Sequence, residues 1–143
     1  MDAFDADALI YAAVPNHALG RRVLPLIPDA ATPSSEPSAA IGSLLLLPEL
    51  LTKPLRDEAK DEVDALLSLL ARLELRPLDE ATAELAVALG VSYGLKAADS
   101  VHLATAVGAG ADRFVTPDKN DFPQTIEEVD VTYLEDLPDP AAA

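Results

Sequence analysis

Acidic residues stand at the ends of three predicted strands, where an α/β protein commonly holds its ligands. They are Asp5 and Asp7, Glu49, and Asp118 and Asp121. The carboxyl ends of parallel strands share one edge of a sheet, so we expect these side chains to converge there. Asp99 joins them from the first turn of the apolar segment LKAADSVHLATAV, where a carboxylate without a partner is costly.

The repulsion between converging carboxylates indicates the chemistry of such a site. Two bare carboxylates about 4 Å apart repel by about 4 kcal/mol at an effective dielectric constant near 20. Three or four cannot all stay ionised without compensation. No Lys or Arg neighbours Asp5 in the sequence, and only Lys119 lies beside Asp118. Because all-oxygen ligands select Mg²⁺ or Mn²⁺ over zinc, we expect a hard divalent cation, which suits phosphodiester hydrolysis.

Alternating strand and helix patterns must position these acids. Strands are expected at the start of 3–11 and over 39–46, 73–78, 112–116 and 129–134. Helices are expected over the rest of 3–11 and over 16–26, 49–53, 57–73, 80–89 and 95–107. This order predicts an α/β fold, a three-layer α/β/α sandwich with a central, mostly parallel sheet of four to five strands.

Local signals set the expected element ends. Pro54 should interrupt the helix that begins near Pro48. Asp79 is a good N-cap for the next helix, and Gly90 should stop it. Residues 28–38 are rich in Pro, Ser and Ala and predict a loop. We expect one domain over 1–136, followed by a disordered tail over 137–143.

Composition restricts the partners. The 143 residues include 25 acidic and 10 basic side chains, a formal charge of −15. Such a surface repels nucleic acid over most of its area, so any RNA contact must be local or bridged by cations. The acidity also maintains solubility. With no Cys, disulfides and thiolate sites are absent. No signal peptide and no apolar run of about 20 residues are present, so we expect a cytoplasmic protein without membrane contact.

Basic and histidine residues offer further candidates. Arg21 and Arg22 could contact phosphate, and Lys53 and Arg56 could do so from behind Glu49, although a solvated face is the simpler interpretation. His17 is expected at the surface. His102 lies three residues beyond Asp99 and shares its helix face, but a packed or surface histidine is the favoured interpretation. The sequence Gly-Ala-Gly at 108–110 indicates a helix stop rather than a phosphate loop.

Four motifs, spanning residues 5–122, resemble those of PIN-domain ribonucleases. FDADALIYA is similar to the first motif, and SLLLLPELLTKP to the second. The segment LKAADSVHLATAVGAGADRFVTPDKNDF is similar to the third and fourth motifs together. Many small bacterial PIN proteins resemble the VapC-like toxins of type II toxin–antitoxin pairs, so the resemblance implies a metal-dependent endoribonuclease of this kind.

This resemblance implies roles for particular residues. Asp5, Glu49, Asp99 and Asp118 would bind Mg²⁺ or Mn²⁺ and support cleavage of RNA to a 5′-phosphate and a 3′-hydroxyl. Three further residues would be auxiliary: Asp7, Thr116 and Asp121. Asp7 could instead cap the following helix, Thr116 could simply end a strand, and Asp121 could be an ordinary turn residue. A cognate antitoxin and a homodimer are the implied partners.

Two other functions compete with the nuclease. The start DADAL also fits a haloacid-dehalogenase-type phosphatase, with Asp5 as nucleophile and Asp7 as general acid; Lys96 and the pair Asp118 and Asp121 could complete that site. A PIN-like module without turnover could instead bind a basic partner segment through its charge. Hydrolysis of a small phosphomonoester would favour the first, and metal binding without RNA cleavage would favour the second.

Overall fold

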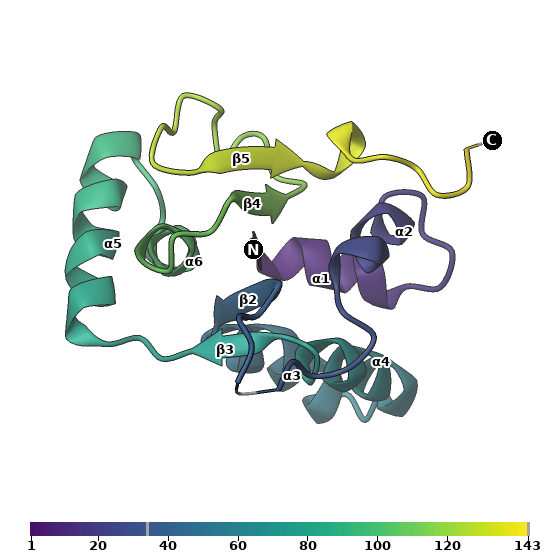
Figure 1. The fold of residues 1–143 in the computed structure, drawn as a ribbon. Coiled ribbons are helices and arrows are strands. Elements are labelled where there is room, and N and C mark those ends of the chain that lie inside the picture. Colours follow the sequence, from purple (N-terminus) through teal and green to yellow (C-terminus); the bar gives the residue numbers. More distant parts are fainter. Residues whose placement is uncertain (34, 143) are drawn as a thin grey trace.

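A five-stranded sheet forms the centre of the molecule in a computed structural model, which describes residues 1–33 and 35–142 (Figure 1). Its strands are β1 (Asp2–Phe4), β2 (Ala40–Ser43), β3 (Glu74–Arg76), β4 (Arg113–Thr116) and β5 (Asp130–Tyr133). Their order is β3-β2-β1-β4-β5, and every neighbouring pair is parallel. The α/β/α prediction is confirmed, and the sheet has the upper number of strands expected.

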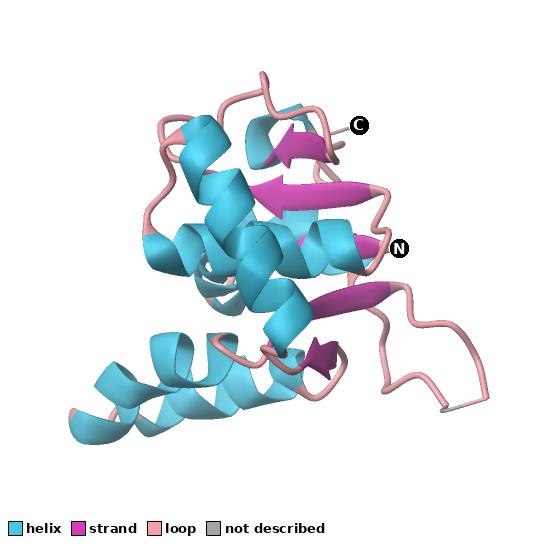
Figure 2. Ribbon diagram, turned by 90° about the vertical axis from the view of Figure 1, so that its left-hand side faces the viewer, coloured by secondary structure: helices cyan, strands magenta, loops and turns pink. Residues whose placement is uncertain are grey.

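Six α-helices cover the two faces of the sheet. They are α1 (Ala6–Ala13), α2 (Gly20–Val23), α3 (Leu46–Arg56), α4 (Lys60–Leu70), α5 (Glu80–Tyr93) and α6 (Ala97–Gly108). In Figure 2, α5 and α6 lie in front of the strands. Alternate strand residues serve separate cores: Phe4 and Val115 pack with α1, α3 and α4, whereas Ala3 and Phe114 pack with α5 and α6. Each described helix is too short or too polar to cross a membrane.

The N-terminus of α5 agrees with the prediction, but its C-terminus does not. The Asp79 carboxylate accepts a hydrogen bond from the Thr82 backbone N–H at 2.8 Å, as an N-cap should. Gly90 does not end the helix, which continues to Tyr93 and is capped by Gly94 at φ 66°. Gly90 instead permits close packing on α6, since an added Cβ would lie 3.0 Å from Ser100 Oγ.

Pro54 does not interrupt α3, contrary to expectation. It lies in the last turn, where its missing N–H removes one helical hydrogen bond, and its ring is buried. The following helix begins at Lys60 rather than 57 because Glu58 adopts a left-handed φ of 55° and separates α3 from α4.

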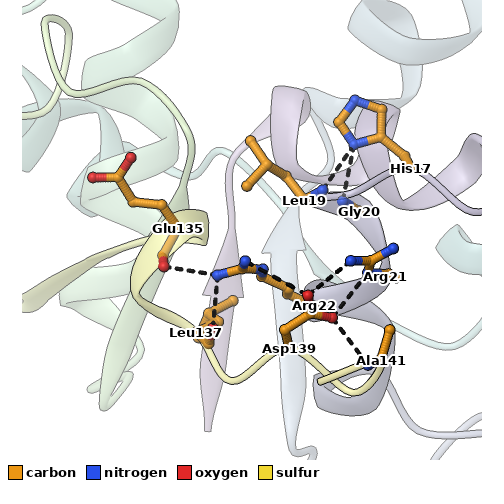
Figure 3. A network of polar contacts seen from close by, with 9 residues as sticks. All are labelled: His17, Leu19, Gly20, Arg21, Arg22, Glu135, Leu137, Asp139 and Ala141. Atoms are coloured by element: carbon orange, nitrogen blue, oxygen red, sulfur yellow. Dashed lines mark hydrogen bonds and ion pairs between the residues drawn. The ribbon is translucent and has the colours of Figure 1, made fainter. Parts of the chain in front are cut away.

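The segment expected to be one helix over 16–26 is divided into α2 and a 3₁₀ turn, η1 (Leu24–Leu26). His17, expected at the surface, is half-buried, and its Nδ1 accepts hydrogen bonds from the backbone N–H groups of Leu19 and Gly20, both at 3.1 Å (Figure 3). Gly20 lies so close to α1 that a Cβ would be 1.9 Å from the Tyr11 carbonyl oxygen. The close packing of α2 on α1 therefore requires glycine here.

The C-terminal segment is docked where a disordered tail was expected. After the 3₁₀ turn η2 (Leu134–Asp136), Leu137 is buried in the core. Arg21 donates two hydrogen bonds, of 2.8 and 2.7 Å, to the Asp139 carboxylate, and Arg22 donates to the backbone carbonyls of Glu135 and Leu137 (Figure 3). Two arginines of α2 thus contact the first part of the segment expected to be disordered over 137–143, and residue 143 lies outside the described residues.

Candidate metal centre

Asp5 lies at the junction of β1 and α1. Its backbone leaves the strand by donating to the Val115 carbonyl, and its side chain caps the helix by accepting from the Ala6 N–H at 2.8 Å. The residue is only 4% exposed. The position is therefore fixed from both sides, by the sheet and by the helix cap.

Thr116 joins Asp5 to the neighbouring strand. β4 pairs directly with β1, and Thr116 is its last residue. The Thr116 hydroxyl donates to Asp5 Oδ2 at 2.9 Å, while its oxygen accepts from the Asp118 backbone N–H at 3.1 Å. This buried hydroxyl therefore does more than end a strand: it links Asp5 to the loop that bears Asp118.

Three carboxylates meet at this edge of the sheet. Each of Asp5, Asp7 and Asp118 offers an oxygen, and the three atoms lie within 4.8 Å of one another. Asp7 was expected to cap α1. Asp5 holds the cap position instead, and Asp7, in the first helical turn, faces the group. Its oxygen is therefore available to a ligand.

The charges of this group are not neutralised within the protein. Burial raises the pKa of Asp5 to about 6, against the opposing hydrogen bond from Thr116. Burial, Asp7 and Asp5 together raise the pKa of Asp118 to about 8. Among residues 1–33 and 35–142, no Lys or Arg forms an ion pair with any of the three. A cluster of carboxylate oxygens with this deficit of positive charge fits Mg²⁺ or Mn²⁺.

Glu49 and Asp99 lie beside this group without belonging to it. Burial raises the pKa of Asp99, and the charges of Asp121 and Glu49 raise it further. Asp99, Glu49 and Asp121 thus form a second, looser set of acids on α6, α3 and the loop after β4. Asp99 is close enough to Asp121 and to Glu49 to be repelled by both, but all three fall outside the compact group of Asp5, Asp7 and Asp118.

A histidine connects the two helical layers at this point. His102 on α6 is 2% exposed, and its Nε2 lies 2.8 Å from Glu49 Oε1 on α3. A packed histidine was expected, but its polar partner was not. The signal in the sequence was the three-residue spacing that puts His102 on the helix face of Asp99.

The basic residues expected to contact phosphate have other neighbours. Arg21 and Arg22 hold the C-terminal segment, as described above. Lys53 is exposed on α3, and Arg56 lies near Asp57 at 3.7 Å. Arg21 and Arg22 are therefore engaged by the C-terminal segment, whereas phosphate contact by Lys53 and Arg56 stays a prediction.

The family is decided by the sequence comparison. A family model described as the PIN domain matches residues 3–127. The chain belongs to the PIN domain family. The matched range contains all six candidate acids of the site (Asp5, Asp7, Glu49, Asp99, Asp118 and Asp121) and favours the nuclease interpretation of the Asp5–Asp7 pair over the phosphatase one.

Solved structures share this PIN fold at low sequence identity. A toxin–antitoxin complex from Klebsiella pneumoniae has a chain of TM-score 0.69 and 22% identity, covering 90% of this chain and 95% of that one. A chain of VapBC2 from Rickettsia felis, bound to a promoter DNA fragment, has a TM-score of 0.68 and 16% identity, covering 92% of this chain and 97% of that one. A chain of VapBC-5 from Mycobacterium tuberculosis has a TM-score of 0.60 and 18% identity, covering 92% of this chain and 95% of that one. No curated protein gives a significant match.

Proposed function

We propose that the protein is a metal-dependent endoribonuclease, the toxin of a toxin–antitoxin pair. The observation that supports this most directly is the meeting of Asp5, Asp7 and Asp118 in a PIN fold, where no Lys or Arg of the described residues forms an ion pair with any of the three. Glu49 and Asp99 would complete the acidic set. Asp121 would act from the rim, and the site would work on RNA in the cytoplasm.

The proposed reaction is hydrolysis of a phosphodiester bond. The oxygen of a water molecule bonds to phosphorus and the bond from phosphorus to the 3′ oxygen breaks, leaving a 5′-phosphate and a 3′-hydroxyl. Bound Mg²⁺ or Mn²⁺ would acidify water and stabilise negative charge on the phosphate. The chain itself supplies the ligands: Asp5, held by Ala6 and Thr116, is preorganised, and Asp7 and Asp118 approach it from a helix and a loop.

An antitoxin partner is supported by the shape and charge of a second region. A groove of about 300 Å³ lies between α1 and α4, with apolar walls that include Ile10, Val14 and Leu66. Asp61 and Glu62 stand at its edge. An amphipathic segment with basic residues would complement both the apolar walls and the acidic rim. Toxin–antitoxin complexes among the similar structures support a partner of this kind.

A homodimer is also part of the proposal. Val87 and Val91 on α5 are 68% and 82% exposed. In a chain of charge −15, an exposed apolar spot on a helix is a place where two copies can approach. Light scattering after size-exclusion chromatography should give twice the chain mass, and a Val91→Glu variant should give the chain mass alone.

Incubation of the purified protein with a pool of single-stranded RNA tests the main proposal. We expect cleavage with Mn²⁺ and none with EDTA or with an Asp118→Asn variant. Asp139→Asn, an acid outside the site, should cleave normally. Hydrolysis of p-nitrophenyl phosphate without RNA cleavage would support the phosphatase. Mn²⁺ binding with neither reaction would support the binding module, and either outcome would overturn the nuclease.

A further inference from the structure

The hydrogen bond between His102 and Glu49 joins two elements that lie on opposite faces of the sheet. α6 packs in the core that contains Phe114, whereas α3 packs in the core that contains Phe4. Nε2 of His102 and Oε1 of Glu49 are 2.8 Å apart. The contact therefore fixes a side chain of the α3 layer from a helix of the α6 layer, at the edge of the sheet where the acids gather.

Burial restricts the hydrogen bonds that the His102 ring can make. Its side chain is 1% exposed, while that of Glu49 is 31% exposed. Within the described part of the chain, His102 Nδ1 is buried without a hydrogen-bond partner. The carboxylate of Glu49 can only accept, so Nε2 must carry the hydrogen. All the hydrogen bonding of the ring is thus directed at Glu49.

The surroundings of His102 connect this contact to the metal-binding group. Burial raises the pKa of both Asp5 and Asp99, and the nearby His102 opposes the rise in each case. The ring therefore lies close to an acid of the compact group and to one of the looser set. A side chain as flexible as glutamate has many rotamers, and a buried donor selects one of them.

We propose that His102 is a positioning residue that holds Glu49 so that its second oxygen, Oε2, is presented to the cation bound by Asp5, Asp7 and Asp118. This inference rests on the proposed function, because it assumes that a cation binds there. It assigns His102 no contact with the substrate and no proton transfer. Its effect is on the orientation of Glu49 and hence on metal affinity.

Two substitutions of His102 separate positioning from packing. His102→Gln keeps an amide N–H near the place of Nε2, whereas His102→Leu fills the buried space without a donor. We expect His102→Leu to lower Mn²⁺ affinity, measured by titration calorimetry, by about 10- to 100-fold. His102→Gln should recover most of that loss. The melting temperature of the metal-free His102→Leu protein should not fall, because the unpaired Nδ1 is removed as well.

A double variant tests whether His102 acts through Glu49. Glu49→Gln should weaken Mn²⁺ binding, and adding His102→Leu should weaken it no further, because the carboxylate to be positioned has gone. Independent, additive losses would overturn the proposal, as would unchanged affinity in His102→Leu.

If His102→Leu does not fold, His102→Asn, whose amide is too short to reach Glu49, takes its place under the same expectations. Absence of Mn²⁺ binding by the unaltered protein would overturn the proposed function and this inference together. Equal Mn²⁺ affinity of the unaltered protein and the His102→Leu variant would overturn the inference alone.

Discussion

Aspartates occupy opposite electrostatic environments in two regions of this molecule. Asp139 receives both hydrogen bonds of the Arg21 guanidinium, which lowers its pKa to about 2 (Figure 3). Asp118 meets burial and two further carboxylates, which raise its pKa to about 8. Asp139 is thus matched by a positive charge, whereas no Lys or Arg in the described part of the chain forms an ion pair with Asp118.

The difference separates an acid that holds the fold together from acids that we propose to bind a metal ion. Asp139 lies far from Arg21 in sequence, and the pair fastens the C-terminal segment to α2. The group of Asp5, Asp7 and Asp118 gains nothing for the fold from its mutual repulsion. A chain with 25 acids therefore cannot be interpreted from its acidity alone; a cluster of partly buried acids that no Lys or Arg of the described residues pairs with marks a candidate site.

The largest expected effect is the loss of cleavage in Asp118→Asn. Removing a proposed ligand should reduce Mn²⁺-dependent RNA cleavage by more than about 100-fold, beyond what loss of an outer hydrogen bond would do. The metal-free variant should melt at a higher temperature than the unaltered protein at pH 8, because one of three repelling charges is gone. A gel assay of RNA cleavage and a thermal melt measure the two effects. A normal rate of RNA cleavage by Asp118→Asn would show that Asp118 is no more important for the reaction than Asp139.

Asp99→Asn should have a smaller but clear effect. The side chain belongs to the looser set, so we expect an intact fold by circular dichroism and a loss of cleavage of about 10- to 100-fold. The rate is measured in the same gel assay as a function of Mn²⁺ concentration. Undiminished cleavage would remove Asp99 from the mechanism and confine the site to the compact group.

The pH dependence of stability should show the repulsion directly. Asp5 and Asp118 have folded pKa values of about 6 and about 8, above the ordinary 3.8. Between pH 3.8 and each folded pKa, the folded protein thus binds more protons than the unfolded chain. Its stability therefore falls as the pH rises to about 6 for Asp5 and to about 8 for Asp118. Thermal melts of the metal-free protein from pH 5 to 8.5 should show this fall. Saturating Mn²⁺ should reverse it; a melting temperature that rises with pH over this range would contradict the assignment.

Asp139→Asn should have the smallest effect. It removes one partner of a pair near the surface, so we expect a fall in melting temperature of no more than about 3 °C. RNA cleavage and Mn²⁺ affinity should stay unchanged. Because the pKa of Asp139 is lowered, the contribution of the pair is present above about pH 4 and is lost as the pH falls towards 2. A strong loss of cleavage would show that the C-terminal segment acts on the site.

Much of the fold was predictable because it depends on short-range patterns. Alternating strand and helix segments gave the α/β class, and Asp79 was recognised as an N-cap because its partner, Thr82, is three residues away. The predicted ends of helices were wrong where a contact with another helix, or the place of a residue within its helix, outweighed the local signal. Gly90 stays inside α5 because it packs on Ser100 of α6, and Pro54 is tolerated because it lies in a last turn.

The sequence by itself determined which residue types were available: acids after strands, an aspartate in an apolar helix, and too few cations to neutralise them. Only the tertiary structure decided their partners. It gave Asp5 the helix cap and placed Asp7 beside Asp5 and Asp118, and it brought His102 to Glu49 across 53 positions of sequence. The physical reason is that a carboxylate responds to burial and to charges within a few ångströms, and the folded chain sets those distances independently of separation in sequence.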